Sequence, residues 1–343
     1  MKMTFLNWKA LPMVGVLALA TMGCKEDEPV QPPAQQTVLQ IAVGSADFDV
    51  LEAAALKAGA GVTGVLGGTA QITVFAPTDA AFVAYLGVAD EAAAITAVNA
   101  LTSAQAADIL TYHVIAGSEI KAAAVPAGPN AEVTTARASN NKAYVTRTAA
   151  GVVSINGATV ATADVDASNG VVHVINQVLR PPVGTVVATA QADSRFELLV
   201  AAVVKAGLVD ALNAAGPLTV FAPTDDALLA TLRTVLSNPS LTEDQAKGAI
   251  PTLTDTSTPL NVPTLRNILL YHVVSGRNYS ALLTAGNVPT LLTPRTVAVA
   301  LPSTGVTVTG GGNGTNASNV IIPNFTTTNG VIHVIDRVLL PAQ

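Results

Sequence analysis

The stretch ITVFAPTDAAF at Ile72–Phe82 returns as LTVFAPTDDAL at Leu218–Leu228. Its first half is β-branched and aromatic, which favours a buried strand in each copy. A proline ends that strand, and the threonine after it, Thr78 or Thr224, stands where a helix N-cap would lie. The stretch therefore predicts a strand followed directly by a helix, and it predicts this twice.

Two further blocks repeat in the same order along the chain. They are ILTYHVI at Ile109–Ile115 with ILLYHVV at Ile268–Val274, and NGVVHVINQVL at Asn169–Leu179 with NGVIHVIDRVL at Asn329–Leu339. A repeat of about 150 residues is too long for a solenoid unit and is typical of a whole domain. We expect two tandem domains, at 37–181 and 183–341.

Within each copy, helical and strand patterns alternate without a regular βαβ rhythm, which indicates an α+β fold. Each copy is expected to open with a helix that carries Phe48 or Phe196 on its apolar face and that Gly59 or Gly207 ends. The last block follows an Asn-Gly turn and is rich in Val and Ile, so it reads as a strand. We expect the strands to pair in the antiparallel manner.

Asp79 and Asp225 follow the strand-ending proline at the start of the second helix. A carboxylate there interacts favourably with the helix dipole, by about 0.3–1 kcal/mol. Catalysis would instead need a second carboxylate at a fixed separation, and no repeated second acid stands out in the sequence. We interpret these aspartates, with Thr78 and Thr224, as structural residues of the motif.

The three blocks resemble the fasciclin-type domain, also known from transforming-growth-factor-induced matrix proteins, and the resemblance covers nearly the whole chain beyond the leader. It implies that each copy is a compact β-sandwich or wedge with flanking helices. It also implies a secreted or surface-anchored protein associated with cell adhesion and matrix binding. In animal relatives the Tyr-His region is implicated in integrin-type adhesion, which makes Tyr112, His113, Tyr271 and His272 candidate adhesion residues.

All four histidines lie in the repeated blocks: His113, His173, His272 and His333. Each pair could form a metal site or an acid–base pair, but a metal site needs three or four ligands and no Cys or His-x-x-x-His companion is present. The strands that carry His173 and His333 are apolar on both faces, which predicts burial. We interpret the histidines as parts of the fold and expect no catalytic residue, no metal and no cofactor.

The first 36 residues differ from the rest in composition. All four methionines, the only tryptophan and the only cysteine fall within the first 24 positions. A lysine-containing start, an apolar stretch at 11–22 and Gly23 before Cys24 predict a signal peptide over 1–23, followed by a lipidated cysteine and a flexible tether over 24–36. The pattern resembles the lipobox of bacterial lipoproteins, in which the cysteine carries palmitate-type acyl chains. The alternative is an ordinary secretory signal with an incidental cysteine.

The balance of charged residues argues against one class of function, nucleic-acid binding. The chain has 17 basic and 23 acidic residues, a net charge of −6, and no basic cluster, so nucleic-acid binding is not expected. We expect a protein that a lipid anchor holds on the outer membrane, exposed at the surface or facing the periplasm. The expected function is that of a binding or cell-adhesion module for a matrix, polysaccharide or cell-surface protein ligand. Two alternatives stay open: a metal-assisted hydrolase that uses the paired histidines, and a structural spacer of the envelope or biofilm matrix.

Overall fold

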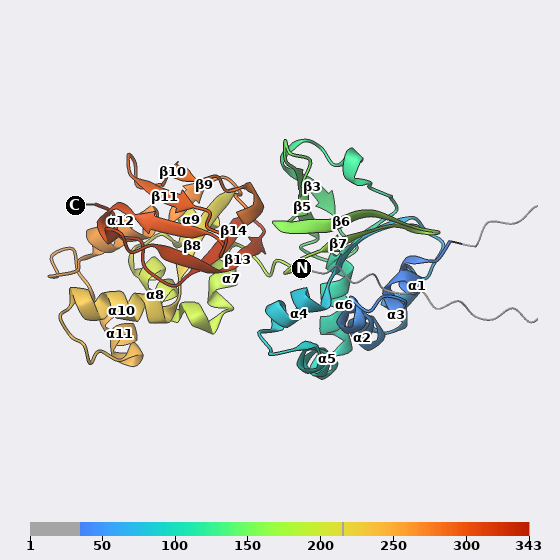
Figure 1. Cartoon of the computed structure of the whole chain (residues 1–343). Helices are drawn as coiled ribbons and strands as arrows, with labels where there is room; N and C mark the ends of the chain where they lie inside the picture. Colours follow the sequence, from blue (N-terminus) through green and yellow to red (C-terminus); the bar gives the residue numbers. More distant parts are fainter. Residues whose placement is uncertain (1–34, 215, 343) are drawn as a thin grey trace, which may run out of the picture. The chain divides into compact units, whose positions relative to one another are not determined.

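The computed structural model describes residues 35–214 and 216–342 (Figure 1). The expected signal peptide, Cys24 and most of the expected tether lie outside the described residues. Among the described helices, none alone is long and apolar enough to cross a bilayer. Two neighbouring helices, Asp79–Leu86 and Glu91–Ala100, reach that length and composition only as a pair bent by 65°.

The first copy contains six helices, seven strands and one 3-10 turn within the described residues. In chain order they are α1 (Val38–Val43), α2 (Asp49–Ala58), α3 (Ala60–Leu66), β1 (Ile72–Pro77), α4 (Asp79–Leu86), α5 (Glu91–Ala100), α6 (Ser103–Tyr112), β2 (Val114–Ala116), η1 (Ala122–Ala124), β3 (Gly128–Thr134), β4 (Lys142–Arg147), β5 (Val153–Ile155), β6 (Ala158–Ala167) and β7 (Gly170–Ile175).

The second copy repeats this order with shifted lengths. Its elements are α7 (Val186–Gln191), η2 (Ser194–Phe196), α8 (Glu197–Lys205), α9 (Val209–Asn213), β8 (Leu218–Pro223), α10 (Asp225–Val235), α11 (Glu243–Ala249), η3 (Ile250–Thr252), α12 (Val262–Tyr271), β9 (Val273–Ser275), η4 (Ser280–Leu282), β10 (Gly286–Pro289), β11 (Thr296–Ala300), β12 (Thr307–Gly310), η5 (Gly311–Asn313), β13 (Ser318–Thr327) and β14 (Gly330–Ile335).

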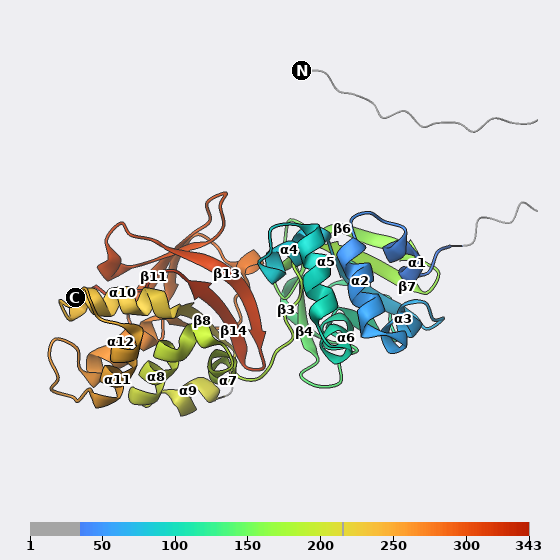
Figure 2. The same cartoon turned by 90° about the horizontal axis from the view of Figure 1, so that it is seen from below.

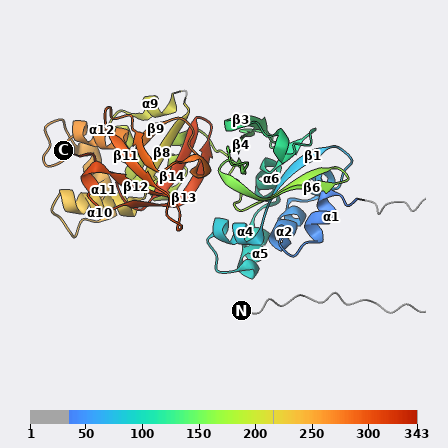
Figure 3. The same cartoon turned by 45° about the horizontal axis from the view of Figure 1, so that its top comes forward.

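Each copy is built on one seven-stranded sheet with the same strand order. That order is β2-β1-β7-β6-β5-β4-β3 in the first copy and β10-β11-β12-β13-β14-β8-β9 in the second, where it is read from the other edge. Figure 3 labels β1 and β6 in the first sheet and β11 to β14 in the second. The ten-residue strand β6 pairs with β5 near its start and with β7 along the rest, with two register shifts. Such irregularities bend a strand, so β6 carries the sheet from one layer of a wedge into the other.

Helices α2, α4, α5 and α6 gather on one face of the first sheet, in front of the strands when seen from below (Figure 2). Side chains of β1 alternate between two cores, as strand geometry requires. Ile72, Val74 and Ala76 pack against these helices. Phe75 points the other way and packs with Ile155 between the two layers of the sheet. Each copy is therefore an α+β wedge with flanking helices, as the resemblance implied.

The pairing of the central strands corrects the antiparallel expectation. β1 runs parallel to β7 over Ile72–Pro77, and β8 runs parallel to β14 over Leu218–Pro223. Both members of each pair are rich in apolar residues, and they are the first and last strands of the repeated motif. Because most of a domain connects them, a crossover long enough for parallel pairing is available, and local sequence patterns carry no signal for it.

The opening helix of each copy also differs from the expectation. A six-residue helix, α1 or α7, precedes the helix that carries the expected apolar face. Thr37 caps α1 in a capping box with Gln40. A helix this short shows less than two turns of periodicity, so the pattern of apolar residues did not reveal it. Phe48 and Phe196 stand at the N-cap of α2 and α8 rather than inside them.

Candidate functional site

The two motif tyrosines lie in the core at the ends of α6 and α12. Tyr112 is fully buried; its hydroxyl donates to the Lys142 carbonyl at 2.8 Å and accepts from Asn156 Nδ2 at 2.9 Å. Tyr271 Oη donates to the Thr296 carbonyl at 2.6 Å and accepts from the Gly311 N–H at 2.9 Å. Burial raises the pKa of Tyr112, so the phenol stays neutral. Each ring ties its helix to the outer strands.

His113 and His272 follow these tyrosines as helix C-caps, and each joins two backbone segments. His113 Nε2 accepts from the Leu179 N–H at 2.8 Å, so Nδ1 carries the proton and donates to the Ile109 carbonyl at 2.8 Å. His272 makes the same two bonds, to Ile268 at 2.7 Å and from Leu339 at 2.9 Å. Burial lowers the pKa of both histidines to about 4, although the carbonyl bond opposes it.

The Tyr-His pairs, which the resemblance makes candidate adhesion residues, are buried in both copies. None of Tyr112, His113, Tyr271 and His272 is more than 3% exposed. Their polar atoms are occupied by the protein's own backbone and by one core amide, so no ligand can reach them in the folded state. Sequence resemblance located them correctly as motif residues, but their contribution is to hold the helix end, the last strand and the outer strands together.

His173 and His333 occupy matching positions in β7 and β14, as the apolar faces of these strands led us to expect. His173 Nδ1 accepts from the Asp164 N–H at 3.3 Å, and Nε2 donates to the Ile120 carbonyl at 2.8 Å. His333 bonds in the same way to Asn324 and Asn278. Each ring also packs on the phenylalanine of the parallel strand, Phe75 at 5.3 Å and Phe221 at 5.6 Å between ring centroids.

Thr78 and Thr224 cap α4 and α10 through their hydroxyls, which accept from Ala81 and Ala227 N–H groups. The aspartates that follow them act on a different helix from the one expected. Asp79 accepts from the N–H groups of Asp49 and Val50 at 3.2 and 2.8 Å, which caps α2. Asp225 caps α8 in the same way, and burial raises its pKa. Sequence reasoning placed a cap here but could not show which helix it serves.

Each of these aspartates has further acidic residues near it, which the sequence pattern did not predict. Ligand oxygens of Asp49, Asp79 and Glu91 lie within 4.8 Å of one another. The matching first residues of α8 and α11, Glu197 and Glu243, both pair with Lys247, at 2.5 and 2.8 Å. Acidic residues at the starts of successive helices were the available signal. Because both oxygens of Asp79 already accept backbone bonds, the cluster is explained as helix capping.

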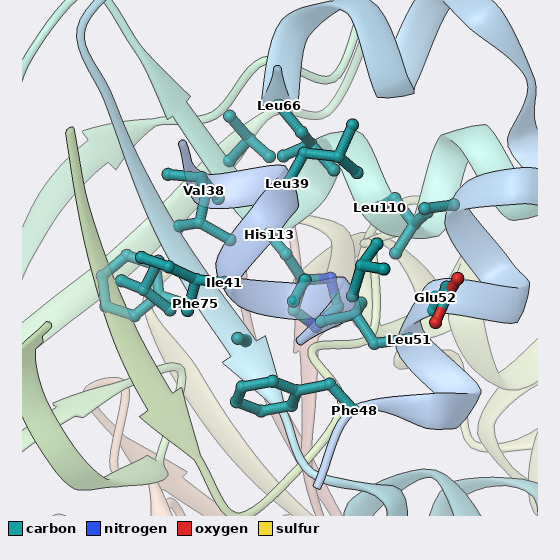
Figure 4. Close-up of a pocket in the computed structure, with 17 residues that line it drawn as sticks. Val38, Leu39, Ile41, Phe48, Leu51, Glu52, Leu66, Phe75, Leu110 and His113 are labelled. Carbon is teal, nitrogen blue, oxygen red and sulfur yellow. The ribbon is translucent and has the colours of Figure 1, made fainter. Parts of the chain in front are cut away.

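Each copy also encloses a small apolar cavity beneath its N-terminal helix. Figure 4 shows the first, where His113 and Phe48 lie among aliphatic side chains from α1, α2 and α6. Its volume is about 30 Å³, and that of its counterpart, beside His272, is about 40 Å³. A volume of about 30 Å³ is one water's share of the liquid, far below the roughly 300 Å³ at which ligand pockets begin. These cavities are packing gaps.

The repeated residues thus form buried contacts that hold each wedge-shaped domain together. The Fasciclin domain family matches the chain at residues 48–181 and 194–341. The chain therefore belongs to the Fasciclin domain family and carries two copies of the domain.

Similar proteins come from bacteria and animals. The uncharacterized protein sll1735 of Synechocystis sp. is 37% identical over 155 residues, 45% of this chain and 96% of that protein. Transforming growth factor-beta-induced protein ig-h3 of Sus scrofa is 27% identical over 320 residues, 92% of this chain but only 39% of that protein. The solved domain pair of the insect cell adhesion molecule Fasciclin I covers 88% of this chain and 95% of its own, at 20% identity and a TM-score of 0.39. Fasciclin domains are known in cell-adhesion and matrix-binding proteins.

Proposed function

We propose that the protein is a binding and adhesion module for an extracellular matrix, polysaccharide or cell-surface ligand, and that it is not an enzyme. One observation carries the proposal: the histidines and tyrosines of the repeated blocks are buried and hydrogen-bonded inside the fold. In each of the four histidines, both ring nitrogens form hydrogen bonds with backbone groups. Recognition is then left to grooves and loops that differ between the copies, where ligand choice normally lies.

The rival reading as a metal-assisted hydrolase needs imidazole nitrogens that can bind a metal or move a proton. His113 and His173 have none to offer, because each nitrogen is already bonded and each ring is at most 2% exposed. The reading as a structural spacer needs no binding site at all, and the binding experiment below separates it from an adhesion module.

Our proposal includes a lipid anchor at Cys24, which would hold the module on the outer membrane, at the cell surface or facing the periplasm. Support comes from the sequence alone: a signal-peptide pattern over 1–23, a small residue before the cysteine and a polar tether after it. A net charge of −6 opposes electrostatic adsorption to anionic lipid, so acyl chains would supply the attachment.

We expect the full chain expressed in a bacterial host to incorporate a clickable fatty acid and to fractionate with membranes. Cys24→Ala should lose the label and leave the membrane fraction, because Cys24 is the only cysteine in the chain. In-gel fluorescence after fractionation measures both effects. Label retained by the Cys24→Ala protein would contradict the anchor.

We expect the protein without its first 24 residues to bind at least one polymer on an array of matrix proteins and bacterial and plant polysaccharides. A biotinylated sample at micromolar concentration reports capture on each spot, and a heat-denatured sample controls for adsorption of exposed apolar surface. Capture of the folded protein alone supports adhesion. Absence of capture on every spot would contradict the proposal and favour the spacer reading.

A further inference from the structure

A groove runs beside α4 in the first copy and has a counterpart in the second. It lies between α4 and the segment after β7, has a volume of about 470 Å³, and includes side chains of β13 in its wall. The counterpart lies between α10 and the segment after β14 and measures about 420 Å³. Both volumes fall in the range of ligand pockets. The wall made by the helix and the segment after the last strand repeats in the two copies, whereas the opposite wall of the first groove comes from Arg195 and β13 of the second copy.

The residues lining the two grooves differ in kind. Arg180 of the first groove occupies the position of Leu340 in the second, and Tyr85 on α4 occupies the position of Thr231 on α10. Since the second copy forms the same wedge with leucine and threonine there, the wedge itself does not require arginine and tyrosine. Arg180 does contact Phe325 of the second copy, but through the face of its guanidinium, which leaves the N–H groups in its plane for a ligand.

Arg180 has no carboxylate in direct contact within the described residues; Asp193 acts on it only from a distance. Its guanidinium lies over the Tyr85 ring at 4.4 Å and the Phe325 ring at 4.6 Å, and takes part in no ion pair. Its one hydrogen bond, to the Tyr85 carbonyl, is long at 3.5 Å. Burial lowers the pKa of Arg180, a sign that the cation has lost part of its water. A partly desolvated cation gains most from an anion.

A second guanidinium adds to the positive charge of the groove. Arg195 lies over the same Phe325 ring, at 5.6 Å, and is paired with Asp193. One carboxylate thus faces two arginines. The protein as a whole carries a net charge of −6, so this local excess of positive charge is the exception on an acidic molecule.

Two amide side chains complete the polar lining. Asn176 Oδ1 accepts from the Thr159 N–H at 2.8 Å, and Gln177 Oε1 accepts from Asn324 Nδ2 at 3.1 Å. With both oxygens engaged, the amide NH₂ groups of Asn176 and Gln177 remain as donors, and neither donates to another described residue. The groove therefore offers planar donors at several points around one cation.

We infer that this groove binds a carboxylate-bearing sugar residue of an acidic polysaccharide. Arg180 would take the carboxylate through paired N–H bonds, and the amides would bond to ring hydroxyls. A lone phosphate would leave most of a groove of about 470 Å³ unfilled, whereas a sugar acid and its neighbour occupy such a volume. The inference rests on the proposed function and names the class of ligand for it.

The test is calorimetric titration of the protein lacking its first 24 residues with trigalacturonate, at low and at physiological salt. We expect measurable binding that weakens with salt, and no binding of neutral maltotriose. Arg180→Leu, which copies the residue of the second groove, should lower the affinity at least tenfold, and Arg180→Lys should fall between. Arg266→Ala removes the same charge from an exposed helix position and should leave the affinity unchanged.

Thermal melts verify that each variant is folded before titration. Equal affinity of folded Arg180→Leu and the unaltered protein would overturn the inference, as would absence of trigalacturonate binding. Inorganic phosphate or triglutamate competing as well as trigalacturonate would also overturn it, because either would mark the groove as a general anion or acidic-peptide site. The proposed function fails separately, when the array captures nothing; capture there that Arg180→Leu leaves unchanged defeats only the inference.

Discussion

Lowering the pH from 7 to 5 is expected to weaken the folded protein by several kcal/mol. The cause is three fully buried histidines, His113, His272 and His333, whose pKa burial lowers to about 4. Each uses one ring nitrogen as an acceptor for a backbone N–H. Protonation would turn that acceptor into a donor facing another donor, so the folded state resists it.

The direction follows from proton linkage. Between about pH 6.5, where a histidine in the unfolded chain titrates, and pH 4, the unfolded state binds more protons than the folded one, so stability falls as pH falls. The stability that comes from keeping these histidines neutral is fully present above about pH 6.5 and is lost as the pH falls from 6.5 to about 4. One pKa unit corresponds to about 1.4 kcal/mol, so at pH 5 each histidine costs roughly 2 kcal/mol. His113 belongs to the first copy, and His272 and His333 belong to the second. The first copy therefore loses about 2 kcal/mol and the second about 4 kcal/mol, of the roughly 5–15 kcal/mol that stabilises an ordinary domain.

Urea unfolding followed by circular dichroism at pH 7, 6 and 5 measures the effect, with the slope of stability against pH giving the protons taken up on unfolding. We expect between about two and three protons in total between pH 5 and 6, about one from the first copy and the rest from the second. His272→Gln should be less stable at pH 7 but should take up about one proton fewer. A stability that does not change between pH 7 and 5 would show that these rings are not held neutral.

Local sequence patterns were enough to predict the strand at Ile72–Pro77, the threonine caps and the buried histidines. Each depends on residues within a few positions of one another, and the doubling of every block supplied an internal check. The α+β class followed from the same local signals, and the family resemblance added the wedge.

Contacts between distant segments were beyond the sequence. The parallel pairing of β1 with β7 joins strands about 100 residues apart, and Asp79 caps a helix that begins 30 residues before it. Arg180 gave no signal, because a single arginine beside two prolines fits a linker as well as a groove. Only the folded structure shows that Arg180 lines a groove, because α4 and the segment after β7 form the groove wall together.

The Asn-Gly pair before the last strand also makes contacts with distant segments that the sequence did not predict, in addition to forming a turn. Asn169 Oδ1 accepts from the Val38 N–H, and its Nδ2 donates to the Leu66 and Gly68 carbonyls, all at 2.9 Å. The asparagine side chain therefore holds α1 and the loop after α3 against the sheet through hydrogen bonds. Asn329 makes the equivalent bonds in the second copy, from Val186 and to Leu212 and Ala214.

Gly170→Ala is expected to cost about 4 kcal/mol or more, at the far end of the range for single substitutions. A Cβ at Gly170 would overlap the Ile72 carbonyl oxygen, and its φ of 144° already disfavours any side chain. That carbonyl belongs to the strand paired with β7, so relief of the overlap must separate the central parallel strands.

Gly117→Ala is the matched control. The φ of Gly117 is 78°, but no heavy atom lies within 4 Å of the new Cβ, so a loss of about 1–2 kcal/mol is expected. Urea unfolding of the three proteins at pH 7 compares them, and equal losses for the two variants would mean that backbone conformation, rather than contact between β1 and β7, makes glycine necessary in the motif.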